Sequence, residues 1–359
     1  MSRNHPYLGL PDYQFWKNEP GILDPGAFDP VTRTSFKLDQ GDAIVTAGSC
    51  FAQHVAKHLT RNGFGVLVTE AAHPIISEEV AAEYHYGMFS ARYGNLYTAR
   101  QLRQLLLRAY GEFTPQETAW RNPRGEWLDP FRPQIQPGGF ASEAELLADR
   151  RQHLAAVRAA IEGLTVFVFT LGLTEAWEDK RDGAVLPLAP GVVGGEFSAE
   201  TFGFHNFDVA ETADDLRFSL DFIRARNPRA KFIITVSPVP LNATAVDRHV
   251  FVSTTYSKAV LRVAAEQVCA ALPLCDYFPS FEIITSPYAR GAYYAADCRA
   301  VTETGVRHVM GVFLRHYAGG GSGEKRQIRP SKARAETQAH LASVEDVVEV
   351  LCDEERITN

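Results

Sequence analysis

Ser49 is the residue whose position in the sequence most favours covalent chemistry. It follows the short apolar run 43–47 and Gly48, and an apolar stripe spaced by four residues begins at Phe51. This pattern predicts a buried strand, a turn at the serine and then a helix. Backbone N–H groups at a helix N-terminus can stabilise an oxyanion, so Ser49 could act as a nucleophile there. A plain N-cap serine is the structural alternative.

Two further groups in the same segment could react or bind. The thiolate of Cys50 would be stabilised at the start of a helix, although this position also favours a cysteine that points into the core. His54 and His58 lie one helical turn apart and could share a metal ion. Because no third ligand lies nearby in the sequence, we expect a solvated helix face, no metal site and no cofactor.

The elements that must position these residues alternate between strand and helix. The expected strands are 43–47, 65–69, 164–171, 231–236 and 275–278. The expected helices are 51–61, 98–110, 142–162, 208–226, 254–272, 302–316 and 343–351. Repeated β-α units predict an α/β fold, a three-layer α/β/α sandwich around a parallel sheet.

In such sheets the site lies at the carboxyl ends of the strands. Four segments should therefore meet at one edge, namely Ser49, the Gly94-Asn95 turn, 172–175 and 237–240.

The remaining segments suggest one domain with additions. Residues 1–40 are expected to form an irregular arm and 41–317 the domain. Two insertions interrupt the domain: 111–141, a candidate lid or substrate-binding loop, and 178–208, a β-excursion. Residues 318–359 are expected to form a glycine-rich linker and a tail, which carries a basic run between Lys325 and Arg334.

Composition narrows the class of protein. The net charge of −7 argues against nucleic acid as the main partner, because phosphate binding requires clustered Lys and Arg. No apolar stretch approaches the roughly 20 residues of a membrane-spanning helix, and no signal peptide is visible. Five scattered cysteines fit reduced thiols. We therefore expect a soluble, cytoplasmic protein.

The stretch Gly48-Ser49-Cys50-Phe51-Ala52 is identical to the signature of the GSCFA family, which resembles the SGNH (GDSL-like) hydrolases. Accompanying blocks at 93–98, 171–177, 235–241 and 276–280 also resemble this family, so the similarity covers about residues 40–317. It implies an SGNH hydrolase-like fold with flavodoxin-like strand order.

The resemblance also implies roles for particular residues. Ser49 would be the nucleophile, and Gly94 or Asn95 would donate to the oxyanion. In the third block Thr174 replaces the usual asparagine donor, followed by Glu175. A hydroxyl is also a donor, so Thr174 remains a candidate.

The acid-base element departs further from the family pattern. Asp297 starts a D-x-x-H spacing, but Ala300 replaces the histidine. His308 lies eight residues later, about 12 Å along a continuous helix. His249 and His205 are alternatives from loops that could fold over the site.

Three functions remain open from the sequence. The first is a serine esterase or acyltransferase acting on a small-molecule or glycan O-acyl ester, with Asp297 orienting a histidine. The second is a binding or scaffold protein that retains the fold without turnover, and Ala300 is its main support. Chemistry at Cys50 is a third possibility.

Overall fold

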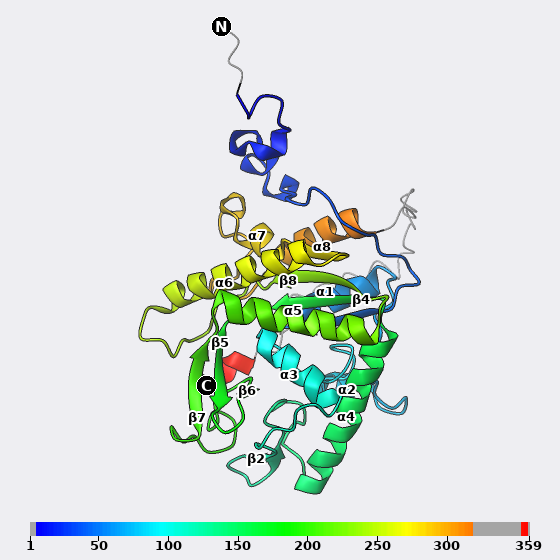
Figure 1. The fold of residues 1–359 in the computed structure, drawn as a ribbon, viewed down its shortest axis with the longest axis vertical. Coiled ribbons are helices and arrows are strands. Elements are labelled where there is room, and N and C mark those ends of the chain that lie inside the picture. The colour runs from blue at the N-terminus through cyan, green and yellow to red at the C-terminus, as the bar shows by residue number, and fades with distance from the viewer. Residues whose placement is uncertain (1–4, 319–352, 358–359) are drawn as a thin grey trace, which may run out of the picture.

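Four parallel strands form the central sheet of the computed structural model, which describes residues 5–318 and 353–357 (Figure 1). They are β1 (Ile44–Gly48), β4 (Val166–Leu171), β8 (Lys231–Val236) and β9 (Cys275–Phe278), in the order β1-β4-β8-β9. The register pairs Gly48 with Thr170 and Leu171 with Val236, so the carboxyl ends of the strands share one edge. The predicted parallel sheet is confirmed.

The predicted strand 65–69 is the exception. Only Val66 bridges to Ile44, through hydrogen bonds on either side of Ile44. Thr69 turns away and donates to the carbonyl of Ser90 instead. The bridge still places this segment outside β1, so the order from the bridge to β9 is that of a flavodoxin-like sheet.

Helices cover both faces of the sheet. One face carries α3 (Ala99–Ala109), α4 (Glu143–Gly163), α5 (Val209–Arg226) and α6 (Val250–Ala271). The other carries α1 (Phe51–Arg61), α7 (Ser280–Thr285) and α8 (Glu303–Tyr317). The three-layer α/β/α sandwich is thus confirmed. Helix α6 begins four residues before its predicted start, because His249 caps it by accepting from the amide of Phe251.

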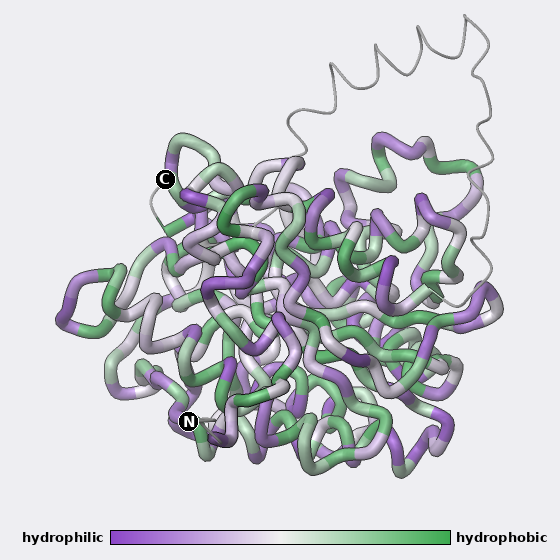
Figure 2. The backbone as a smooth tube through the Cα atoms, turned by 90° about the horizontal axis from the view of Figure 1, so that it is seen from above, coloured by the Kyte–Doolittle hydropathy of each residue, from purple (hydrophilic) through white to green (hydrophobic). Residues whose placement is uncertain are grey.

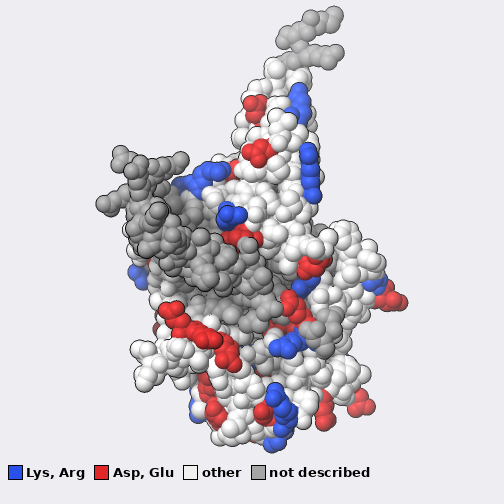
Figure 3. All heavy atoms as spheres, turned by 180° about the vertical axis from the view of Figure 1, so that it is seen from behind, with Lys and Arg blue, Asp and Glu red and all other residues white. Residues whose placement is uncertain are grey.

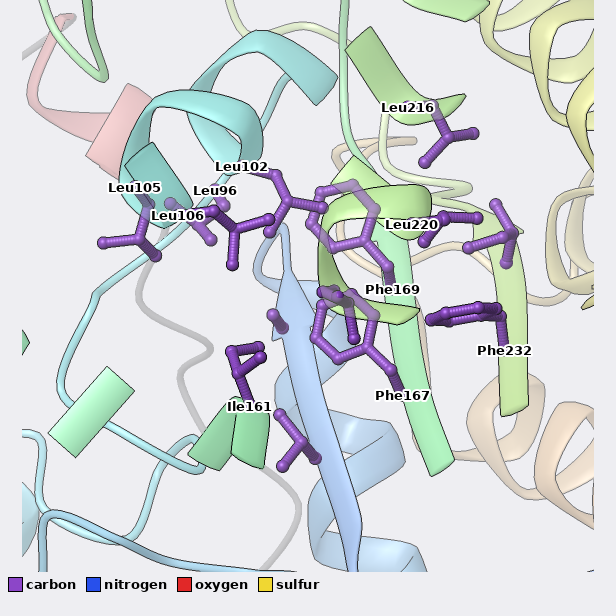
Figure 4. Packing of buried hydrophobic residues seen from close by; sticks show 14 of the residues in the cluster. Leu96, Leu102, Leu105, Leu106, Ile161, Phe167, Phe169, Leu216, Leu220 and Phe232 are labelled. Carbon is purple, nitrogen blue, oxygen red and sulfur yellow. The ribbon is translucent and has the colours of Figure 1, made fainter. Parts of the chain in front are cut away.

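Phe167 and Phe169 of β4 anchor the largest hydrophobic cluster of the described residues (Figure 4). They lie two residues apart and therefore point to the same face, where their rings stack with centroids 6.0 Å apart. Leu102 of α3 and Leu220 of α5 pack around them. Burial of such side chains contributes about 2–3 kcal/mol each, which fixes the central strand and hence the edge where the site lies.

The two insertions contain short antiparallel strands. In the first, β2 (Trp120–Arg121) pairs with β3 (Trp127–Leu128). The predicted β-excursion is a three-stranded sheet of β5 (Glu175–Asp179), β6 (Ala184–Leu186) and β7 (Phe202–Asn206), ordered β6-β5-β7. It begins three residues before the predicted boundary, directly after the end of the 172–174 segment.

The remaining described elements are short. They are α2 (Glu78–Glu83) and the 3-10 turns η1 (Asp12–Gln14), η2 (Trp16–Asn18), η3 (Pro20–Ile22), η4 (Pro25–Ala27), η5 (Pro287–Ala289) and η7 (Asp353–Ile357). Many hydrophilic stretches lie on loops that project from the body (Figure 2). The predicted helix 343–351, the glycine-rich linker and the basic run lie outside the described residues.

The composition predicts a surface without a dominant basic patch and a chain without a membrane-spanning helix. On the face seen from behind, acidic and basic side chains are interspersed over the described residues (Figure 3). Within the described ranges, no helix combines the length and the apolar character needed to cross a bilayer.

Candidate functional site

Gly48 and Ser49 form the turn at the carboxyl end of β1. Gly48 has φ +135°, and a Cβ there would lie 2.3 Å from the carbonyl oxygen of Thr170, so only glycine fits. The amide of Ser49 donates to the same carbonyl oxygen at 3.0 Å. The turn is therefore fixed against β4, and the amide of Ser49 itself is already used.

The hydroxyl of Ser49 is enclosed but has no partner. The residue is 2% exposed, and among the described residues its Oγ makes no hydrogen bond. Gly172 packs closely on both Ser49 and Tyr97, because a Cβ at Gly172 would lie 3.0 Å from Ser49 Cβ and 3.1 Å from the Tyr97 ring. A buried hydroxyl without a partner costs free energy, which makes this group a candidate for function.

The Gly94-Asn95 turn lies beside Ser49, as predicted from the topology. The amide of Leu96 donates to the carbonyl oxygen of Gly48 at 2.8 Å, which ties the turn to the end of β1. Gly94 adopts φ +69°, a left-handed conformation that favours glycine. The side-chain oxygen of Asn95 accepts from Gln53 of α1 at 3.3 Å. The orientation of the Asn95 amide is thereby set.

The amide nitrogen of Asn95 donates to a carboxylate from the end of the chain. Asn95 Nδ2 lies 3.0 Å from Asp353 Oδ2, and Gln134 Nε2 lies 2.5 Å from Asp353 Oδ1. The hydroxyl of Tyr97 donates to Asp353 Oδ2 at 3.3 Å and accepts from the amide of Asp353 at 2.9 Å. Asp353 is 7% exposed and lines a pocket together with Gly94 and His85.

Thr174 and Glu175, at the end of β4, have structural partners. The hydroxyl of Thr174 donates to Asn206 Oδ1 at 2.6 Å. The carboxylate of Glu175 accepts from the hydroxyl of Thr244 at 2.7 Å and from the amide of Ala245 at 3.3 Å. Both residues lie at the predicted edge, but these contacts hold the neighbouring β-excursion and the loop before α6.

The predicted acid-base pair is not assembled around Ser49. Asp297 is exposed, and its Oδ1 accepts from the amides of Arg299 and Ala300 at 3.0 Å in a local turn. His308 lies on α8 with Nε2 2.9 Å from the carbonyl oxygen of Phe28 and Nδ1 2.7 Å from the hydroxyl of Tyr293. The carbonyl requires a proton on Nε2, so Nδ1 is the acceptor and both ring nitrogens are used.

The alternative histidines also have structural contacts. His205 lies between the carboxylates of Glu178 and Glu211, at 3.3 and 2.9 Å. His249 caps α6, as described above. Cys50 is 3% exposed, which agrees with a cysteine that points into the core. Among the described residues, His54 and His58 belong to no group that could hold a metal ion.

The structure brings His85 into the pocket, and sequence reasoning missed it. His85 follows α2 with φ +59° and lines the pocket with Gly94, Asn95 and Asp353. Burial lowers its pKa to about 4, so the ring is neutral at neutral pH. Its ring nitrogens make no hydrogen bond within the described part of the chain. A loop histidine without a recognisable motif offers no sequence signal.

A second buried histidine lines the adjoining pocket. His153 of α4 is bonded through Nδ1 to Glu70 at 2.8 Å, whereas its buried Nε2 has no partner among the described residues. Burial lowers the pKa of His153 to about 4. Phe131, Arg132 and Pro187 line both pockets, so the two are neighbours that share these residues as walls.

The GSCFA family model matches residues 43–313. The chain belongs to the GSCFA family. The GSCFA match begins at β1 and ends within α8, so it contains the whole sheet, the Ser49 turn and the Gly94-Asn95 turn. Asp353, which binds Asn95, lies outside the GSCFA match. No curated protein matches the chain.

Proposed function

We propose that this GSCFA protein is a serine esterase or acyltransferase related to the SGNH hydrolases, acting on an O-acyl substrate. The observation that carries the proposal is the buried, unpartnered hydroxyl of Ser49 just before α1, in a turn to which the Gly94-Asn95 segment is tied through the Leu96 amide. Ser49 would attack the acyl carbonyl, forming an ester with the enzyme and releasing the alcohol. Water or a second alcohol would then take the acyl group.

The oxyanion formed in that step requires donors at the same edge. The Asn95 amide already donates to a carboxyl oxygen, that of Asp353, and an oxyanion would present an oxygen acceptor in the same way. Among the described residues, the amides of Cys50 and Phe51 at the start of α1 have no acceptor, and they are the backbone donors available to the proposed site.

His85 is the general base that this geometry favours over His308. It is neutral, lines the Asn95 pocket and has a ring free of hydrogen bonds to described residues, whereas His308 uses both nitrogens in other contacts. A base must approach the serine to within hydrogen-bond reach during the reaction. This assignment replaces the D-x-x-H histidine that Ala300 removes.

The alternative is a binding protein without turnover. It is favoured by two observations: Asp297 is tied into its own turn, and position 300 is alanine. A domain of this kind would use the buried pocket to hold an acylated ligand and leave its ester intact.

A fluorophosphonate probe separates the two functions. We expect the probe to label the full chain at Ser49, and Ser49→Ala to abolish labelling, while the exposed-site control Ser198→Ala labels like wild type. Short p-nitrophenyl esters should be hydrolysed in parallel. The variant Asp353→Ala is tested beside wild type, because it frees the Asn95 amide from Asp353. If neither chain is labelled and neither hydrolyses the esters, the enzyme proposal is overturned. Labelling that survives Ser49→Ala would exclude Ser49 as the nucleophile.

A further inference from the structure

The geometry points to a carboxylate-binding subsite formed by Asn95, Tyr97 and Gln134, which the chain's own C-terminal segment 353–357 occupies and thereby closes the candidate site. The docking of the segment follows from the hydrogen bonds of Asp353 alone. Its consequence for turnover rests on the function proposed above.

The contacts of Asp353 are those of a built site. Both carboxylate oxygens accept hydrogen bonds, Oδ1 from Gln134 and Oδ2 from Asn95 and Tyr97, and the backbone amide of Asp353 donates back to Tyr97. All three donors are neutral. Such a set recognises a carboxylate by geometry and leaves its charge in place.

Burial of the Asp353 carboxyl costs desolvation free energy, which the hydrogen bonds of the docked segment must offset. Desolvation raises the pKa of the Asp353 carboxyl, while the three side-chain hydrogen bonds act in the opposite direction. A carboxylate that is almost fully buried is unusual, because charged residues are rarely buried without partners. The partners here come from two separate parts of the fold.

The segment also bridges the parts of the chain that surround the site. Arg356 Nε donates to Gln134 Oε1 at 3.3 Å, in the first insertion. Glu355 Oε1 lies 3.4 Å from Arg299, in the loop that carries Asp297 and Ala300. Figure 1 shows the segment, in red, beside α3. It therefore joins the Asn95 turn, the insertion and the loop before α8.

Closure follows from where these contacts lie. Asp353 takes up the Asn95 amide that the proposed reaction needs for its oxyanion. Tyr97, which packs on the Gly172 that lies against Ser49, is bonded to both the carboxylate and the amide of Asp353. Covalent attachment makes the docking of such a segment an intramolecular event, which favours it over the binding of a free ligand. Release of the segment opens the pocket to a carboxylate or to an acyl substrate.

Hydrogen exchange of the full chain tests docking directly. In Asp353→Ala, we expect the segments 93–98 and 130–136 to exchange at least tenfold faster than in wild type, whereas β4 and β8 stay unchanged and so report an intact fold. Asp353→Asn should have an intermediate effect. The matched control is Asp214→Ala, at an exposed aspartate of α5, which should match wild type throughout. Unchanged exchange of 93–98 and 130–136 in Asp353→Ala would overturn the proposal.

A labelled synthetic peptide with the sequence of residues 350–359, carrying Cys352→Ser, tests the subsite itself. Full-length Asp353→Ala should bind it at least tenfold more tightly than wild type, whose own segment competes. Adding Gln134→Ala should reverse this gain, and a peptide carrying Asp353→Ala should not bind. Equal binding of the intact peptide to the wild-type and Asp353→Ala chains would contradict a shared subsite.

Fluorophosphonate labelling links docking to the proposed function. The labelling rate of Ser49 should rise at least fivefold in Asp353→Ala. Faster exchange without any labelling in either chain would leave docking established and overturn the esterase. Labelling at equal rates in both chains, despite faster exchange, would refute closure while keeping the esterase.

Discussion

The two halves of the predicted catalytic site have different fates in the fold. The half that would bind an acyl group is assembled: Ser49, Gly172 and Asn95 meet at one sheet edge with the Ser49 hydroxyl unpaired. The half that would move protons is not, because Asp297 closes a surface turn and His308 braces Phe28 to α8. Backbone topology dictates the first half, whereas the second depends on individual side chains in loops.

Removal of the proposed nucleophile is the most severe test of the assembled half. Ser49→Ala should lower the turnover of p-nitrophenyl esters by about 10³-fold or more, because no other group forms the acyl-enzyme. Steady-state kinetics measure this, with Ser198→Ala as the control. If Ser49→Ala retains most of the activity, the assembled half is a binding site and the chemistry lies elsewhere.

Asn95→Ala tests the oxyanion donor. Loss of one such donor costs about 10²–10³-fold in kcat, so we expect a fall of that size with a smaller change in KM. Thr174→Val should cost less, about tenfold or under, because the Thr174 hydroxyl is directed to Asn206.

The control is Asn18→Ala, in the exposed part of the arm. If Thr174→Val proves the more damaging substitution, the donor predicted from the third block would be the correct one.

Acid titration tests the buried histidine under the pocket. Because the pKa of His153 is held near 4 in the folded chain, the unfolded chain binds a proton between about pH 6.5 and 4 that the folded chain does not. The folded state must therefore lose stability as the pH falls through this window, by about 2–3 kcal/mol from this one group.

Urea unfolding at pH 7 and pH 4.5 measures that loss. His153→Gln should lose about 2–3 kcal/mol less between the two pH values than wild type. The control His5→Gln, at an exposed position, should lose as much as wild type. An unaltered loss in His153→Gln would mean that this ring is protonated in the folded state.

A pair of histidine substitutions gives the finest test of the unassembled half. His85→Gln should lower kcat by about 10²-fold, the contribution of a general base. His308→Gln should chiefly lower the unfolding temperature, since it loses two hydrogen bonds worth about 1 kcal/mol each, and turnover should change far less. The reverse result would restore His308 to the site and mean that α8 shifts during the reaction.

Much of the scaffold could be predicted because its signals are periodic and local. The strand 231–236 and the strand 275–278 follow from apolar runs that are buried on both faces, and the Ser49 turn from a glycine between strand and helix. The prediction of a strand at 65–69 was wrong because this segment forms only one bridge to the edge strand β1. Loop contacts, such as that of Thr69 with Ser90, replace the rest of the pairing.

The pocket side of the site could not be predicted in the same way. Asp353 reaches Asn95 across 258 positions of sequence, and no local pattern encodes such a contact. His85 lines the pocket and has a left-handed backbone conformation, which is uncommon for residues other than glycine and is not signalled by the local sequence. Side-chain roles in the acid-base half depend on loops, where periodicity gives no guidance.

Tyr97 also links two distant parts of the chain, in addition to packing on Gly172 next to Ser49. Its hydroxyl is bonded to Asp353, and its carbonyl oxygen accepts from the amides of Gly172 and Leu173 at 2.8 and 3.1 Å. One residue thus joins the end of the chain to the end of the central strand. A displacement of the C-terminal segment would therefore act, through this one aromatic side chain, on the backbone that packs against the serine.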